Sequence, residues 1–333
     1  MLMEAMDLAL KIPGTLLSPS GQNARLSILI YHRVLPESDP LFPSEVDSAR
    51  FDAQMKHVSR IFNILPLADA VERLKSNTLP ARAACITFDD GYADNAEIAL
   101  PILKKHGIPA TFFVSTGYLN GGIMFNDSVI ECVRMTKKES LSLSSLGLNE
   151  LPVQTIAEKR SAIESILSIL KYREPLLRQE LVDEIRSMTG IDPPMDLMLE
   201  DDQVRLLSGS GMEIGGHTVN HPILASVDSK IARTEIQNGK EYLEALTGRP
   251  VRLFAYPNGK PGTDYLAEHA AIVKELGFDA AVSTAVGVAH KKSDLFQLPR
   301  FTPWDRSSLH FSLRLIGNLS KTDPKMALPD GMP

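Results

Sequence analysis

Two short motifs carry residue types that could perform metal-assisted hydrolysis. Asp89 and Asp90 lie in a Thr-Phe-Asp-Asp-Gly motif, closely after an apolar run. His217 and His221 lie four positions apart in a His-Thr-Val-Asn-His motif far downstream. One carboxylate and two imidazoles are a sufficient ligand set for a catalytic metal with open coordination positions. The second carboxylate is then left over to act as a base.

Each motif also has a purely structural interpretation. Asp-Asp-Gly is a common turn sequence, and an Asp pair can cap the helix expected near Asp94. Adjacent residues on a strand point to opposite sides, so both carboxylates can serve one site only if the chain turns. Gly91 supplies such a turn. A lone His pair at this spacing is more often structural or solvated, but its place after Gly-Gly at a strand end favours metal binding.

Two further segments add candidate groups. His32 follows a buried-strand pattern, and an imidazole titrates near neutral pH, which suits a general acid. The alternative is a packed or capping histidine. Tyr256 and Asn258 lie in a Tyr-Pro-Asn-Gly turn whose backbone N–H groups could bind an oxyanion, the alternative being a simple β-turn. No role is assigned to the other histidines, which are His57, His106, His269, His290 and His310.

The elements that must position these residues read as alternating strands and helices. Strands are expected at 26–31, 83–88, 110–114, 212–216, 253–255, 280–283 and 296–298. Helices are expected at 51–61, 67–74, 94–106, 230–246 and 263–276. Pro101 either kinks the third of these helices or marks its true start. This alternation predicts an α/β fold with a parallel sheet, a distorted (β/α)7-type barrel. The candidate residues all follow strands, at the barrel face that carries the chemistry.

The alternation of strands and helices is interrupted once, at about 118–200. Helical runs near 127–136 and 157–188 predict a mainly helical insertion there. The expected organisation is an N-terminal amphipathic segment (1–25), a barrel with this insertion (26–319) and a flexible tail (320–333).

Composition excludes some classes of function. The chain has 35 basic and 41 acidic residues, so its net charge of −6 argues against a nucleic-acid partner. Cys85 lies in an expected strand and Cys132 in an expected helix, which favours free thiols and a reducing compartment.

The first residues do not read as a secretory signal, because Glu4 and Asp7 precede the first lysine. No run is long and apolar enough to span a bilayer. A short amphipathic helix here either docks on the domain, which we favour, or lies on a membrane surface. We therefore expect a cytoplasmic protein, with the inner membrane face as the alternative place of action.

The two motifs resemble those of the polysaccharide deacetylase family, carbohydrate esterase family 4. Residues 87–91 match its first motif in full, and residues 217–221 match its second, His-Ser/Thr-x-x-His. The resemblance implies a distorted barrel, a divalent metal and hydrolysis of N-acetyl groups on hexosamines. It also implies that Asp89 is the general base and that Asp90, His217 and His221 are the metal ligands. Zn²⁺ is the first choice, and Fe²⁺, Ni²⁺ or Co²⁺ also suit this ligand set.

Two departures from the family pattern concern the base and the acid. The family's third motif supplies an arginine that this chain lacks beside Tyr256, and Arg300 is the candidate replacement. No Leu-x-His motif supplies an acid near the C-terminus. The branch that deacetylates poly-N-acetylglucosamine places the equivalent histidine in a Tyr-His string after the first strand, which His32 resembles. The chain is thus most similar to that branch, and His32 is the expected acid.

The expected function is removal of N-acetyl groups from an N-acetylhexosamine-containing polysaccharide or glycan precursor. Two alternatives remain. A related barrel could hydrolyse a non-peptide C–N bond in a small amide, or a degenerate barrel could bind glycan without cleaving it.

Overall fold

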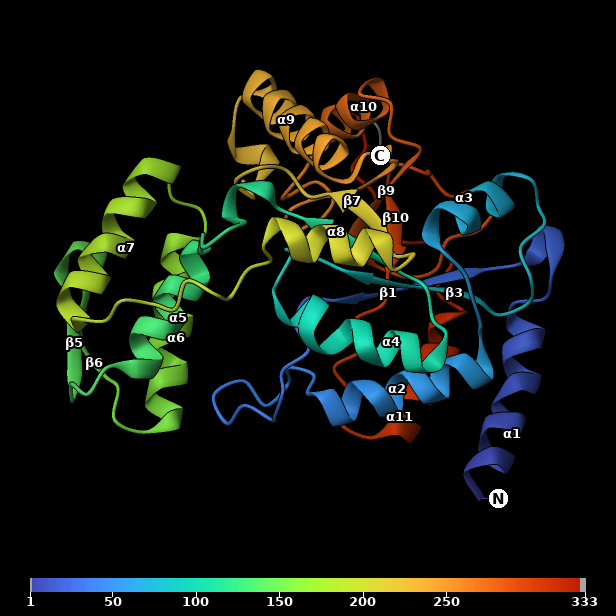
Figure 1. Cartoon of the computed structure of the whole chain (residues 1–333), viewed down its shortest axis with the longest axis horizontal. Coiled ribbons are helices and arrows are strands. Elements are labelled where there is room, and N and C mark those ends of the chain that lie inside the picture. The colour runs from blue at the N-terminus through green and yellow to red at the C-terminus, as the bar shows by residue number, and fades with distance from the viewer. Residues whose placement is uncertain (1, 330–333) are drawn as a thin grey trace.

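The computed structural model describes residues 2–329 of the chain (Figure 1). Seven strands form one parallel sheet in the order β1, β3, β4, β7, β8, β9, β10. Their bounds are β1 Leu26–Tyr31, β3 Ala83–Phe88, β4 Ala110–Val114, β7 Glu213–Gly216, β8 Leu253–Ala255, β9 Ala280–Val286 and β10 Leu298–Arg300. A short strand, β2 (Asn63–Ile64), pairs with the start of β3.

The sheet curves until its two ends nearly meet. Phe301, directly after β10, donates its backbone N–H to Ile28 at 2.7 Å and accepts one from Ile30 at 3.1 Å. These two bonds join β10 to β1 across the gap. The predicted distorted (β/α) barrel is therefore confirmed.

Side chains alternate along the strands between the barrel interior and an outer layer of helices. In β3, Cys85 packs in the interior cluster, whereas Ile86 and Phe88 pack in the outer cluster. Because both faces are covered, every residue of β1 and β3 is buried, which explains their near-continuous apolar sequences. The same alternation directs Asp89 toward the barrel axis.

One end of the barrel is closed by α3 (Leu67–Lys75), whose apolar residues join the interior cluster. Glu213, at the start of β7, accepts the backbone N–H groups of Leu67 and Ala68 at 2.8 and 3.2 Å. A carboxylate at a helix N-terminus satisfies free N–H groups and complements the helix dipole. The open mouth of the barrel is therefore the opposite end, where the carboxyl ends of the strands lie.

The outer layer consists of α2 Ser48–Ile61, α4 Leu100–His106, α8 Asp201–Gly209, α9 Ser229–Thr247, α10 Ala267–Glu275 and α11 Ser308–Asn318. The N-terminal helix α1 (Leu2–Leu17) packs beside α2 and α11. The packing is close, because a Cβ on Gly14 would lie 2.9 Å from the Ile316 side chain. None of the helices in the described part of the chain combines the length and apolarity needed to cross a membrane.

The insertion stands beside the barrel as a separate lobe with its own apolar core (Figure 1). Its elements are α5 Phe125–Met135, β5 Ser140–Leu143, β6 Leu148–Pro152, α6 Ile156–Leu170 and α7 Pro175–Thr189. Two expectations need correction. The single helical run at 157–188 is two helices, because Pro175 disfavours a helical residue before it. The antiparallel hairpin β5–β6 was not predicted at all.

Other boundaries also shift. The expected helix at 94–106 is a π-helical turn (Asn95–Ala99) followed by α4, with Pro101 in the first turn of α4, where a proline is tolerated. The last strand ends at Arg300 rather than at 298. The tail expected to be flexible is described to residue 329, and there Ala327 is buried and exchanges two hydrogen bonds with Gln297. Its residues 330–333 lie outside the described part.

Candidate active site

Asp89 and Arg300 form a buried ion pair inside the barrel mouth. Their strands are not neighbours in the sheet, but both side chains point inward and meet across the axis. Arg300 Nη1 and Nη2 each donate to one Asp89 oxygen at 2.7 Å, while Arg300 Nε donates to the Ser283 carbonyl at 2.8 Å. Bidentate guanidinium–carboxylate pairs combine strength with a fixed orientation. Arg300 therefore occupies the place proposed for the arginine missing beside Tyr256.

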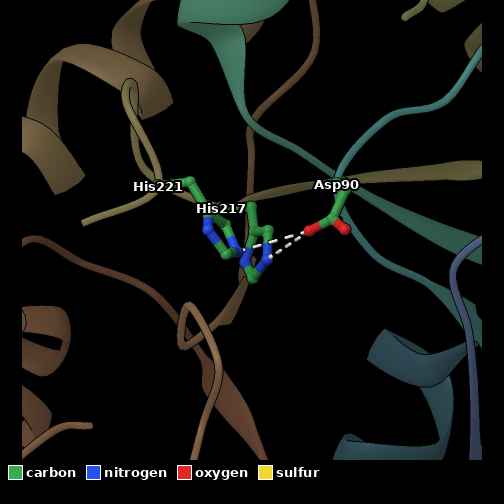
Figure 2. Close-up of side chains that lie close together, drawn as sticks. All are labelled: Asp90, His217 and His221. Carbon is green, nitrogen blue, oxygen red and sulfur yellow. Dashed lines mark ion pairs between the residues drawn. The ribbon is translucent and has the colours of Figure 1, made fainter. Parts of the chain in front are cut away.

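Asp90, His217 and His221 converge from two strand ends onto one point (Figure 2). Asp90 Oδ1 lies 3.2 Å from His217 Nε2 and 3.3 Å from His221 Nε2. One ligand atom from each of the three residues falls within 4.8 Å of the others. This is the facial carboxylate–imidazole arrangement that the sequence predicted.

The donor chemistry of this triad fits a metal ion. His217 Nδ1 lies 2.7 Å from the Ala255 carbonyl, which can only accept, so the ring proton belongs on Nδ1 and the Nε2 lone pair faces Asp90. Asp90 Oδ1 is buried and has no hydrogen-bond partner among the described residues. Converging lone pairs without a donor are costly unless a cation lies between them. The residues therefore fit a divalent metal.

The backbone at the site is held in conformations that most residues avoid. Asp90, Thr218, His221 and Asn258 all have positive φ, at 75°, 66°, 50° and 59°. Such angles cost of order 1–3 kcal/mol each for non-glycine residues and cluster at functional sites. Glu235 holds the loop between the histidines, because its carboxylate accepts the backbone N–H of residues 219 and 220 at 3.0 and 2.7 Å.

A glycine before the first histidine is required by packing. A Cβ on Gly215 would lie 2.4 Å from the Phe113 ring inside the barrel, so no larger residue fits there. The close approach lets β7 pass next to β4 and deliver His217 to the mouth.

The electrostatics of the site favour a cation. Burial alone would lower the pKa of His217, but Asp90 and Asp89 outweigh it and raise that pKa. Burial would likewise raise the pKa of Asp90, but His217 and His221 hold it well below its usual value. Burial also opposes ionisation of Asp89, yet Arg300 outweighs it and lowers the Asp89 pKa. Asp89 is thus ionised at neutral pH, as a general base must be.

His32 is exposed on the rim of the same cavity as Asp89 and Asp90. Two interactions hold its loop: Asn95 Nδ2 donates to the His32 carbonyl at 2.9 Å, and Arg33 pairs with Asp94 at 2.8 Å. The expected acid therefore lies on the same solvent-open cavity as the expected base.

Only one of the two residues predicted from the turn after β8 lines the cavity. Asn258 lines the cavity, and its backbone N–H donates to no other described residue. Tyr256 does not line the cavity. It is fully buried, stacks on Tyr265 at 3.8 Å and donates its hydroxyl to the Phe296 carbonyl at 2.8 Å. Its expected contact with substrate needs correction, because strand alternation turns its side chain into the outer packing layer.

Asp127 is a site residue that sequence reasoning missed. It lies on α5 of the insertion, lines the cavity and accepts the Tyr92 hydroxyl at 3.1 Å. Burial raises its pKa to about 7, although Arg33 opposes the rise. No signature marked Asp127, since it is one carboxylate of a helix whose distance from the barrel motifs the sequence does not reveal.

We expect Asp127→Asn to change how stability depends on pH. Between about pH 4 and pH 7 the folded wild type holds a proton on Asp127 that the unfolded chain has released. Wild-type stability should therefore fall with rising pH in this window, by at most about 1.4 kcal/mol per unit, and the variant should lack this slope. Denaturant unfolding at pH 5, 6, 7 and 8 measures it. The exposed Glu164→Gln in α6 is the control, and parallel profiles for wild type and Asp127→Asn would contradict the assignment.

Comparison with known proteins agrees with this site. The family model described as polysaccharide deacetylase matches residues 76–281. The poly-beta-1,6-N-acetyl-D-glucosamine N-deacetylase of Staphylococcus aureus (strain MRSA252) is 27% identical over 179 residues, which are 51% of this chain and 60% of that protein. This chain therefore spans about three fifths of the length of that relative.

Two solved structures share the fold. Streptococcus pyogenes deacetylase PplD, in complex with acetate, aligns with a TM-score of 0.59 and 21% identity, covering 88% of this chain and 98% of that one. IcaB from Ammonifex degensii aligns with a TM-score of 0.56 and 18% identity, covering 90% and 98%. At these identities the likeness shows the fold alone.

The family match includes Asp89, Asp90, His217 and His221, and it covers more than half of the 333 residues. His32 and Arg300 lie outside the matched span; in the structure His32 lines the cavity that holds the motifs, and Arg300 is buried, where it pairs with Asp89. With the barrel, the two motifs and the family match in agreement, the chain belongs to the polysaccharide deacetylase family.

Proposed function

We propose that this protein is a metal-dependent hydrolase that removes N-acetyl groups from the N-acetylglucosamine units of a polysaccharide or glycan precursor. The observation that supports the proposal is that a candidate base and a candidate metal-ligating triad lie next to each other at one cavity. Asp89 is ionised and oriented by Arg300, and the next residue, Asp90, forms a metal-ligating triad with His217 and His221. A base next to an electrophilic centre is what amide hydrolysis requires.

Asp90, His217 and His221 would hold the metal, with Zn²⁺ as the first choice and Fe²⁺, Ni²⁺ or Co²⁺ as alternatives. When bound, such a metal polarises an amide carbonyl and lowers the pKa of a coordinated water. The Ala255 carbonyl holds the His217 ring in the tautomer that leaves Nε2 free for this role.

The other steps, which are proton transfer and stabilisation of the oxyanion, are assigned to residues of the protein. Asp89 takes the proton from the attacking water, and Arg300 keeps its two oxygens in a fixed orientation. Asn258 lines the cavity, and we assign its backbone N–H as the donor to the oxyanion that develops on the acetyl carbonyl. His32, on the rim, gives a proton to the leaving amine. The balanced products are acetate and a free amino sugar.

The staphylococcal relative, described as a poly-beta-1,6-N-acetyl-D-glucosamine N-deacetylase, supports β-1,6-linked N-acetylglucosamine as the first substrate to test. The cavity of about 420 Å³ can accept a sugar rather than only a small amide. A glycan-binding barrel without activity is disfavoured, because it would have no need for the paired base or for lone pairs converging on one point.

The test is acetate release from N-acetylglucosamine oligomers by metal-depleted protein to which single divalent metals are added back. We expect release only with metal, and no turnover of small cyclic amides. Metal should also raise the free energy of unfolding by about 2.7 kcal/mol at 100 times its Kd, because it binds the folded triad. His217→Ala should lose this stabilisation, whereas His310→Ala, at an exposed position remote from the triad, should keep it. Acetate release that is undiminished after chelation would contradict the proposal.

A further inference from the structure

The cavity above the triad has two walls of different character. The barrel wall carries the acid-rich site around Asp89 and Asp90, and the insertion supplies the facing wall from α5, α6 and the start of α7. The insertion residues on the cavity include Phe125, Lys171 and Arg178. The insertion therefore lies where it can contact a substrate group attached to the reacting sugar.

Four cationic side chains other than histidine line the cavity, and they fall into two classes. Arg33 pairs with Asp94 at 2.8 Å, and Arg134 pairs with Asp39 at 2.8 Å. The side chains of Lys171 and Arg178 contact only aromatic rings, and neither forms an ion pair or side-chain hydrogen bond with a described residue.

The Arg178 guanidinium is held in place without being neutralised. It lies 4.3 Å from the centre of the Phe125 ring, a cation–π contact that restricts it while leaving its N–H groups free. Glu174, the acid four residues before Arg178, instead accepts the backbone N–H groups of Leu176 and Leu177 at the start of α7. Arg178 is only partly exposed, and burial lowers its pKa. A partly buried charge without a partner is costly.

A purely structural explanation accounts for only part of this arrangement. The Phe125 contact explains why the Arg178 side chain packs over this ring. A methionine at position 178 could pack there in the same way, so packing alone does not explain the positive charge. Lys171 contacts the Tyr172 ring at 5.5 Å and gains no ion pair there. Glu45, an exposed cavity acid from the loop after β1, pairs with neither cation in the described part of the chain. Two unmatched positive charges thus face the cavity from one wall.

We propose that Lys171 and Arg178 form an anion subsite that binds a phosphoryl group carried by the acetamido sugar. A planar guanidinium and a flexible ammonium suit phosphoryl oxygens, and two positive charges match a phosphate dianion or a diphosphate better than a single carboxylate. This inference rests on the proposed deacetylation and names its substrate class: a sugar phosphate, either in a nucleoside diphosphate sugar or in a lipid diphosphate-linked precursor.

The experiment compares N-acetylglucosamine 1-phosphate with the uncharged methyl glycoside of N-acetylglucosamine, using the metal-loaded enzyme. We expect kcat/KM to be at least about tenfold higher for the phosphate, mainly through KM, because charge-assisted hydrogen bonds add affinity. Arg178→Met keeps the stem over Phe125 and should reduce the ratio to about one. Lys171→Met should reduce it partly. Arg173→Met, at an exposed position between the same helices and off the cavity, should leave the ratio unchanged.

Binding measured separately distinguishes this inference from the proposed activity. Calorimetry with N-acetylglucosamine 1-phosphate should show binding that Arg178→Met weakens at least about tenfold and that added salt weakens in wild type. Binding without acetate release would retain the subsite and reject the activity. Release from the methyl glycoside, with no preference for phosphate and no effect of Arg178→Met, would reject the subsite alone. Preference for a uronic acid derivative over the phosphate would reject the phosphoryl assignment.

If the sugar phosphate is preferred, one further comparison distinguishes a nucleotide-linked substrate from a lipid-linked one. Uridine diphosphate N-acetylglucosamine represents the nucleotide-linked form, and a short-chain isoprenyl diphosphate N-acetylglucosamine represents the lipid-linked form. The higher kcat/KM identifies the source, and equal values for both identify the shared diphosphate as the recognised group.

Discussion

Asp89→Asn is expected to lower the rate of acetate release at least about 10²-fold, the usual scale for losing a general base. The amide cannot accept the proton of the attacking water at neutral pH. Asp90, His217 and His221 do not depend on the Asp89 charge for their positions, so metal binding should survive. The measurement is single-turnover acetate release at saturating metal, together with metal content after dialysis.

The same substitution disturbs Arg300, and the experiment must separate this effect from catalysis. Arg300 is fully buried and both of its terminal nitrogens donate to Asp89, so the single variant leaves a buried guanidinium without its counter-charge. The double variant Asp89→Asn/Arg300→Met removes both charges and should recover folding stability but not activity. Asp183→Asn, an exposed acid of the insertion, is the matched control for loss of one carboxylate. Wild-type turnover in a folded Asp89→Asn protein would reject Asp89 as the base.

The barrel could be predicted from sequence because its strands are covered on both faces. Such strands read as apolar runs, so the seven predicted runs correspond to seven of the eight strands of the sheet; the two-residue strand β2 was not predicted. The hairpin at 140–152 escaped prediction because its apolar residues, such as Leu141 and Leu143, alternate with serine over only a few positions. A four-residue alternation is too short to distinguish from a loop.

The site was predictable where its residues lie close together in the sequence, and less so where the fold brings them together. The triad comes from two compact motifs, and the structure places its three residues as expected. The last strand was expected to end at residue 298, so the sequence did not show that the Arg300 side chain points into the barrel. The observed β10 includes Arg300. Tyr256 was wrongly assigned to substrate contact, since one residue of strand register decides whether a side chain faces the mouth or the outer packing layer. Asp127 and Arg178 carry no motif, because only the folded insertion brings them to the cavity.

Arg300→Met is expected to destabilise the protein by about 3–5 kcal/mol at neutral pH, the usual cost of leaving a buried charge without its partner. In wild type, Arg300 keeps the pKa of Asp89 below its ordinary value despite complete burial. A lowered folded pKa contributes stability above the unfolded pKa of about 3.9, and this contribution is lost as pH falls through the folded value. In the variant only His217 and His32 still oppose the effect of burial on Asp89, so the folded pKa should exceed the unfolded one and stability should fall as pH rises above about 4. The difference between the two proteins should therefore grow from acid to neutral pH.

Denaturant unfolding between pH 4 and pH 8 measures this divergence, and the pH–rate profile measures its catalytic consequence. With the Asp89 pKa raised, the acid limb of acetate release should move to higher pH, so that the variant regains part of its activity under alkaline conditions. Arg300→Lys keeps the positive charge but not the bidentate geometry, and it should shift the limb less than Arg300→Met does. A uniform loss of rate at every pH, with stability curves that run parallel, would mean that Arg300 supports only the packing of the mouth and does not set the ionisation of the base.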